Sequence, residues 1–139
     1  MRDYKKEYEE RVAFIRNLLE KSGAKGIVYG NSGGKDSALV GILCKAACDN
    51  TVGIIMPCAS KRNFGQDAED ARIVADQYGI ETRFIDLTPV REAEMQQLSS
   101  LTEVTPAAAV NIAPRLRMTT LYAVAASEGR LVAGTGNRS

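Results

Sequence analysis

The sequence contains no histidine among its 139 residues. This absence removes Ser-His-Asp triads, Cys-His pairs and histidine-ligated metals from the chemistry open to the chain. Cysteine is scarce too: Cys44, Cys48 and Cys58 are odd in number and lack the paired C-x-x-C spacing of zinc sites. We expect all of them to be reduced thiols. Any chemistry must then rest on oxygen ligands, Lys or Arg side chains, and backbone dipoles.

Net charge and long apolar segments are also lacking. Eighteen basic and seventeen acidic residues give a formal net charge of +1, without a run of like charge that would indicate a nucleic-acid or membrane surface. No segment approaches the ~20 apolar residues that a membrane span needs. We therefore expect no nucleic-acid partner, no membrane association and a cytoplasmic location.

Apolar runs and segments of helical spacing alternate along the chain. Strand-like runs are found at 26–29, 52–56, 82–85 and 131–133. Helices are expected at 8–19, 38–48, 68–78, 89–98 and 112–127, with 99–110 as an irregular connection. Strands separated by helices predict right-handed βαβ units. We expect a single α/β domain over residues 1–139, a doubly wound, mostly parallel sheet with helices on both faces.

The most informative motif is S-G-G-K-D-S at residues 32–37, between the first strand and the next helix. In this arrangement backbone N–H groups and the positive end of the helix can cradle a phosphate. Gly33 and Gly34 allow close approach of the backbone, and Ser32 and Ser37 add hydroxyl donors. Asp36 would repel a bare phosphate unless a divalent cation lay between them, which indicates Mg²⁺ bound with a nucleotide.

Three alternative readings of this motif are open. The P-loop of kinases and GTPases ends in Gly-Lys-Ser/Thr, whereas Asp36 occupies the hydroxyl position here. Ser32 and Lys35 also match the S-x-x-K of penicillin-recognising enzymes, but neither K-T-G nor S-D-N follows. A third reading is a glycine-rich turn without a ligand, which is less typical of this motif directly after an apolar strand.

S-G-G-x-D-S after the first strand resembles the pyrophosphate-binding signature of the PP-loop ATP pyrophosphatases. Two later segments narrow the resemblance: N-I-A-P-R-L-R-M at 111–118, followed by Leu121 and Tyr122, and G-T-G-N-R-S at 134–139. Both are similar to segments of NAD synthetases, in the same order and spacing. The resemblance covers nearly all of this chain and about the N-terminal half of a family member, and it implies a Rossmann-like fold of the adenine nucleotide alpha hydrolase type.

The resemblance implies a ligase of NAD biosynthesis, of the ammonia-dependent type. Such an enzyme converts deamido-NAD (nicotinic acid adenine dinucleotide) to NAD with ammonia, through an adenylated intermediate, and releases AMP and pyrophosphate. Its cofactors would be ATP and Mg²⁺, and the protein would be a homodimer.

The resemblance also implies site residues. Those expected to bind ATP are Gly30, Asn31, Ser32, Gly33, Gly34, Lys35, Asp36, Ser37, Arg117 and Thr135. Among them Asp36, Ser32 and Ser37 are expected to be catalytic, with Asp36 as the magnesium ligand. Asn111, Arg115 and Tyr122 are expected to bind the dinucleotide.

Helical geometry allows such a division of roles. Asn111, Arg115 and Tyr122 lie close to one face of the predicted helix, whereas Arg117 points elsewhere. Structural alternatives are an N-cap for Asn111, surface salt bridges for the two arginines and core packing for Tyr122.

Two departures from the family pattern bear on function. Asn31 stands where the family commonly has an aliphatic residue. The family's second magnesium carboxylate directly follows the serine that corresponds to Ser139, the last residue here. We expect the functional protein to continue further, and the isolated chain to be inactive. The alternatives are a non-catalytic nucleotide-binding fragment, or another PP-loop enzyme of the tRNA-modifying or amidotransferase type.

Overall fold

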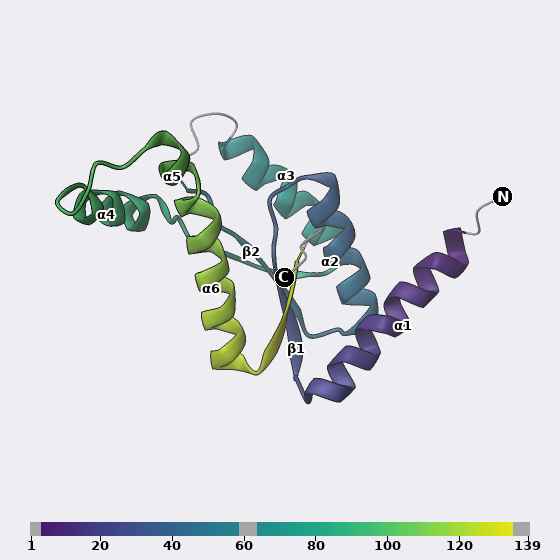
Figure 1. The fold of residues 1–139 in the computed structure, drawn as a ribbon. Coiled ribbons are helices and arrows are strands. Elements are labelled where there is room, and N and C mark those ends of the chain that lie inside the picture. The colour runs from purple at the N-terminus through teal and green to yellow at the C-terminus, as the bar shows by residue number, and fades with distance from the viewer. Residues whose placement is uncertain (1–3, 59–63, 135–139) are drawn as a thin grey trace.

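The computed structural model describes residues 4–58 and 64–134 (Figure 1). Within these ranges parallel strands form a sheet in the order β3-β2-β1-β4. The strands are β1 (Gly26–Gly30), β2 (Thr51–Ile55), β3 (Glu81–Phe84) and β4 (Arg130–Ala133). The helices are α1 (Tyr4–Ser22), α2 (Lys35–Ala47), α3 (Phe64–Gln77), α4 (Thr88–Ser99), α5 (Pro106–Val110) and α6 (Ile112–Glu128).

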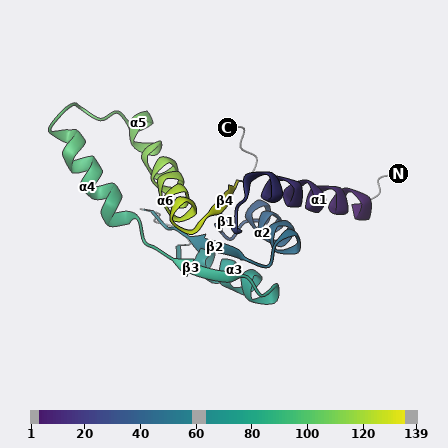
Figure 2. The ribbon, with the colours of Figure 1, turned by 90° about the horizontal axis from the view of Figure 1, so that it is seen from below.

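Helices cover both faces of the sheet. Figures 1 and 2 show α2 and α3 on one face and α6 on the other, with α1 packed on α2 and with α4 and α5 beside α6. The chain winds outward from β1 to β3 and then returns through α4, α5 and α6 to place β4 on the other side of β1. The predicted doubly wound parallel sheet is therefore confirmed. None of the helices in the described ranges is long and apolar enough to cross a membrane.

The core lies on both sides of β1, because successive side chains of a strand point to opposite faces. Val28 is fully buried on the face covered by α6, where it packs in one cluster with Leu121 and Ala125. Tyr29 is buried on the opposite face, where its cluster includes Ala75 of α3. Burial on both faces explains why β1 and β2 read as largely apolar runs rather than as alternating ones.

Several element boundaries differ from the sequence prediction. Helices α1 and α3 each begin four residues earlier than expected, at Tyr4 and Phe64. Helix α2 begins at Lys35 rather than at residue 38, so the last part of the glycine-rich motif forms its first turn. Residues 99–110, expected to be an irregular connection, contain the short helix α5. The Thr105 side chain accepts a hydrogen bond from the N–H of Ala108 at 3.2 Å, and Pro106 occupies the first helical position. These are strong helix-start signals, and the alanines that follow are the best helix formers.

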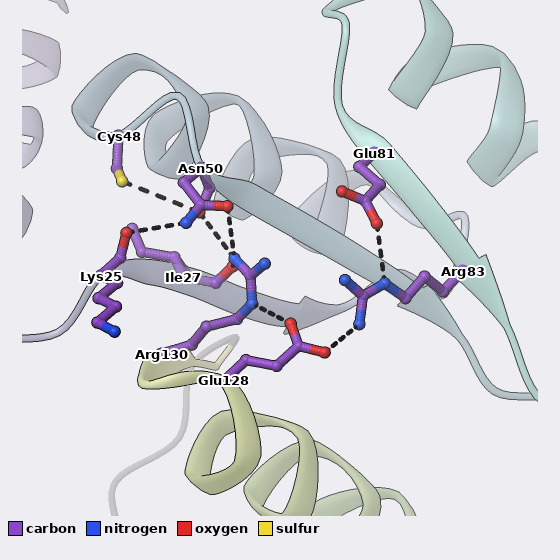
Figure 3. A network of polar contacts seen from close by, with 8 residues as sticks. All are labelled: Lys25, Ile27, Cys48, Asn50, Glu81, Arg83, Glu128 and Arg130. Atoms are coloured by element: carbon purple, nitrogen blue, oxygen red, sulfur yellow. Dashed lines mark hydrogen bonds and ion pairs between the residues drawn. The ribbon is translucent and has the colours of Figure 1, made fainter.

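A polar network joins the amino ends of the strands (Figure 3). The Arg130 side chain is only 7% exposed; its Nη1 donates to the backbone oxygen and to Oδ1 of Asn50, both at 3.0 Å. Arg130 Nε donates to one carboxylate oxygen of Glu128 at 2.7 Å, and Arg83 Nη1 donates to the other at 2.6 Å. Arg83 Nε also donates to Glu81 at 2.9 Å. The network thus connects the starts of β2, β3 and β4.

Acid should weaken this network at Glu128. The hydrogen bonds from Arg83 and then from Arg130 lower the pKa of Glu128 from 4.5 to about 2. A lowered folded-state pKa means that the stabilisation is complete above pH 4.5 and is lost as the pH falls toward 2. Glu128→Gln should lower the melting temperature at pH 7 and flatten its decline over this acid range. Circular dichroism melts across pH measure both effects.

The control for this experiment is Glu92→Gln, at an exposed carboxylate of α4. It should leave the melting temperature at pH 7 unchanged. Equal pH profiles for the wild type and Glu128→Gln would contradict a stabilising role of the network.

Tyr29 requires glycine at two neighbouring positions. A Cβ at Gly41 of α2 would collide with the Tyr29 hydroxyl, and a Cβ at Gly53 of β2 would lie 2.9 Å from it. Gly41→Ala should therefore lower the free energy of unfolding by about 1–3 kcal/mol through overpacking. Adding Tyr29→Phe should recover part of this loss, because the hydroxyl is the nearest atom. Urea unfolding measures the free energy of unfolding of each variant. If the effects of Gly41→Ala and Tyr29→Phe were additive in the double variant, the predicted contact between the two side chains would be contradicted.

Candidate functional site

The glycine-rich loop leaves the sheet at the carboxyl end of β1. The Asn31 N–H donates to the Ile54 carbonyl of β2 at 2.9 Å, which continues the β1–β2 ladder beyond Gly30. The order of the strands reverses between β1 and β4, so the loop stands at the topological switch point of the sheet. In open parallel sheets ligands bind at this point, outside the carboxyl ends of the strands.

Two serines close the loop. The buried Ser37 hydroxyl lies 3.2 Å from the Ser32 hydroxyl, and Ser37 Oγ also accepts from the Ser32 N–H at 3.2 Å. Ser37 further donates to the Gly34 carbonyl at 3.2 Å. Because Ser37 belongs to the first turn of α2, these bonds attach the loop to the start of that helix.

The backbone of the loop depends on Gly33. Its φ of +87° lies in a region that L residues rarely adopt. Gly34 occupies the N-cap of α2 in an extended conformation, with φ −85°. Because it is a glycine, it has no side chain that could cap the helix. The first N–H groups of α2 therefore have no capping side chain, and the positive end of this 13-residue helix faces the loop. This arrangement of a glycine-rich turn and an uncapped helix start is one that can accept a phosphate group.

Lys35 and Asp36 follow in the first turn of α2, and both are exposed. No group of three or more His, Cys, Asp or Glu side chains that could hold a metal ion is present in residues 4–58 and 64–134. Mg²⁺ does not require such a group, because it is commonly bound through one or two carboxylates, phosphate oxygens and water. A single exposed carboxylate next to a phosphate cradle fits this chemistry, so Asp36 is the candidate ligand.

Arg117 reaches the same edge of the sheet from α6. Its Nε donates to the Met56 carbonyl at 2.8 Å, just beyond the end of β2. The Met56 side chain in turn packs against Gly30, with Cε 3.1 Å from where a Cβ of that glycine would lie. Arg117 and the loop are thus connected through Met56. Sequence reasoning missed Met56, because a carbonyl acceptor leaves no signal in the sequence.

The residues expected to bind the dinucleotide lie on α6 and at the residue just before it. Asn111, Arg115 and Tyr122 are all exposed, Tyr122 to 56%. Asn111 stands at the N-cap of α6, as the structural alternative predicted, but its side chain makes no N-cap bond and donates instead to the Ala107 carbonyl at 3.0 Å. Tyr122 is not part of the core, so the core-packing alternative for it is wrong. Thr135 lies outside the described residues.

Two buried titratable groups next to β1 do not serve acid–base chemistry. Burial, and then the nearby Cys44 thiol, raise the pKa of Tyr29 to about 12. Burial, and then Cys48, raise the pKa of Cys44 to about 12 as well. Both groups stay protonated near neutral pH. All cysteines of the chain are free thiols, as the sequence predicted.

Comparisons with known proteins agree on one family. The sequence model described as NAD synthase matches residues 7–139. The chain is 40% identical to the NH(3)-dependent NAD(+) synthetase of Carboxydothermus hydrogenoformans, over 99% of this chain and 56% of that protein. It is 37% identical to the enzyme of the same description from Pyrobaculum aerophilum, over 99% of this chain and 51% of that protein. The chain thus spans about half the length of these curated relatives.

Solved structures give the same result. The NH3-dependent NAD synthetase from Campylobacter jejuni matches with a TM-score of 0.87 and 33% identity, over 98% of this chain and 58% of that one. The NMN synthetase from Francisella tularensis matches with a TM-score of 0.89 and 30% identity, over 99% of this chain and 56% of that one.

Gly33 and Gly34 should respond differently to substitution. Gly33→Ala forces a side chain into a positive-φ conformation and should lower the free energy of unfolding by about 1–2 kcal/mol. Gly34→Ala should cost less, because φ is −85° and the new Cβ would lie 3.5 Å from Ser32 Oγ, an ordinary contact. Urea unfolding of both variants tests this order. A larger loss for Gly34→Ala would contradict the described loop conformation.

Proposed function

The chain belongs to the NAD synthase family, and from this we propose that it supplies the ATP-binding part of a ligase that makes NAD from deamido-NAD, ammonia and MgATP. The observation that carries the proposal is the closed loop at residues 32–37, which stands at the switch point of the sheet and at the positive end of α2. The relatives that match nearly the whole chain are described as NH(3)-dependent NAD(+) synthetases.

In this proposal the loop binds the phosphates of ATP. The first N–H groups of α2, which no side chain caps, and the exposed Ser32 hydroxyl act as donors to the group that leaves as pyrophosphate. Gly33, Gly34 and the buried Ser37 shape the loop, because the Gly33 N–H is bonded to Asn31 Oδ1 and the Ser37 hydroxyl to the Gly34 carbonyl. Lys35, exposed in the first turn of α2, adds a positive charge at this end of the site. Asp36 would hold Mg²⁺, which when bound neutralises negative charge on the phosphates.

Arg117 is proposed to act next to the nucleotide. Its Nε is occupied by the Met56 carbonyl, which leaves the terminal nitrogens of the guanidinium as further donors. A guanidinium held at one nitrogen is preorganised for an anion at the others. Thr135 remains a proposed ATP contact on resemblance alone.

The proposed reaction has two steps. The carboxylate of deamido-NAD attacks the α-phosphorus of ATP, the bond to the β-phosphate oxygen breaks, and pyrophosphate leaves. Neutral ammonia then attacks the acyl carbon, AMP departs with the electron pair of the acyl–oxygen bond, and a proton is released. These steps need positioning and charge stabilisation more than a side-chain acid or base, which suits a chain without histidine.

The dinucleotide and a second subunit are proposed to meet the outer surface of α5 and α6. This surface carries the exposed side chains of Asn111, Arg115 and Tyr122. It also carries apolar side chains that are exposed to solvent in the monomer. Among them Val110, the last residue of α5, is 69% exposed. Exposed apolar side chains near a proposed ligand face are typical of a surface that another chain covers. A homodimer would cover them.

Product analysis tests the proposed function. Incubation of a complete enzyme that contains this chain with deamido-NAD, ammonia and MgATP should yield equal amounts of NAD, AMP and pyrophosphate. Asp36→Asn should lower turnover by at least about 100-fold, because it removes the metal-binding charge. The control, Asp49→Asn, changes a fully exposed aspartate before the amino end of β2, far from the loop, and should leave turnover unchanged.

Two further comparisons make the test specific. Nicotinic acid mononucleotide should be a poorer substrate than the dinucleotide; the opposite preference would favour the activity named for the Francisella tularensis relative. Release of ADP and orthophosphate in place of AMP and pyrophosphate would contradict the proposed mechanism.

A further inference from the structure

We infer that Asn31 is a positioning residue, which holds the phosphate loop in its binding shape by fastening it to α3 and does not itself contact the nucleotide. The inference deepens the proposed function and rests on it for the identity of the ligand. Its structural basis is the set of contacts that the buried Asn31 side chain makes.

Asn31 has no free surface for a ligand. The residue is 4% exposed, one of the few buried polar residues of the described chain. Its backbone N–H is used by the Ile54 carbonyl of β2 at 2.9 Å. Burial leaves this side chain little surface on which a phosphate could bind.

Both ends of the Asn31 amide have partners. Nδ2 donates to the Ala71 carbonyl of α3 at 3.2 Å, in a bond that is buried and spans 40 residues. Oδ1 accepts from the Gly33 N–H at 3.2 Å. One side chain therefore ties the strained turn of the loop to a helix that is packed against the sheet. Ala71 is fully buried, so this anchor is fixed by the core.

The Gly33 bond has a direct consequence for the site. Gly33 adopts φ +87°, and the bond to Asn31 Oδ1 holds its N–H in one orientation. Without that acceptor, a glycine samples a wide range of conformations, and the loop must be ordered again when a phosphate binds. Asn31 thus lowers the entropic cost of binding without adding a contact to the ligand.

The test compares Asn31→Leu with a matched variant, Thr51→Val. Asn31→Leu removes both side-chain bonds. Thr51 is also a buried polar residue, with Oγ1 donating to the Cys44 and Cys48 carbonyls at 3.1 and 2.7 Å, but it lies at the opposite, amino end of β2. Thr51→Val therefore removes buried side-chain-to-backbone bonds without touching the loop.

Two measurements are made on each variant. Amide hydrogen exchange followed by NMR should show Gly33 exchanging about fivefold to tenfold faster in Asn31→Leu, as expected for one lost hydrogen bond. Exchange at Val28 in β1 should stay unchanged. Calorimetric titration with magnesium pyrophosphate should show affinity weakened by a similar factor, whereas adenosine affinity should not change. Thr51→Val should alter neither the Gly33 exchange rate nor either affinity.

The outcomes separate the inference from the proposed function. If the wild type binds neither pyrophosphate nor MgATP, the proposed function fails, and the Gly33 exchange rate still decides whether Asn31 positions the loop. Wild-type exchange at Gly33 in Asn31→Leu overturns the inference, as does equal acceleration at Gly33 and Val28. If Asn31→Leu does not fold, Asn31→Ala removes the same bonds without added bulk, and the same criteria apply.

Discussion

The hydrogen bond from the Asn31 N–H to the Ile54 carbonyl is the constraint on which the site depends. It extends the parallel ladder of β1 and β2 by one residue, so the chain enters the loop in a fixed direction. The Ser32 and Ser37 hydroxyls can then meet, and α2 starts at Lys35 with its positive end at the loop. A phosphate site built in this way needs no histidine and no metal cluster, in agreement with the composition of the chain.

The two ends of the sheet are built differently. At the amino ends, charged side chains bond to one another and to backbone carbonyls, and Arg130 is almost buried among them. At the carboxyl ends, the side chains of Lys35 and Asp36 are exposed. Gly33 and Gly34, which precede them, have no side chains and leave the backbone accessible. This division follows a general rule of parallel sheets, in which one edge provides stability and the other carries ligands.

The sequence was sufficient for the fold and for the position of the loop. Apolar runs separated by helical spacing predicted β1 to β4, and the motif at 32–37 was expected between a strand and a helix, where it lies. The helix α5 was missed although Thr105 and Pro106 mark its start.

Long-range contacts were beyond sequence reasoning. Arg117 was expected near ATP, but its bond to the Met56 carbonyl, 61 residues away, had no signal. Asn31 was expected to contact the nucleotide, whereas its side chain bonds to α3 and to Gly33. In each case the partner is a backbone group, and every residue carries such groups. Only the fold selects which of them a side chain meets.

The central claim is that residues 32–37 form a pyrophosphate cradle. Titration of the ¹⁵N-labelled chain with magnesium pyrophosphate, followed by amide chemical shifts, tests it most directly. The account predicts saturable shifts concentrated at Ser32, Gly33, Gly34 and the first turn of α2, with small shifts around Arg130. Shifts concentrated at the Arg130 edge, or no saturable shift at the loop, would contradict it.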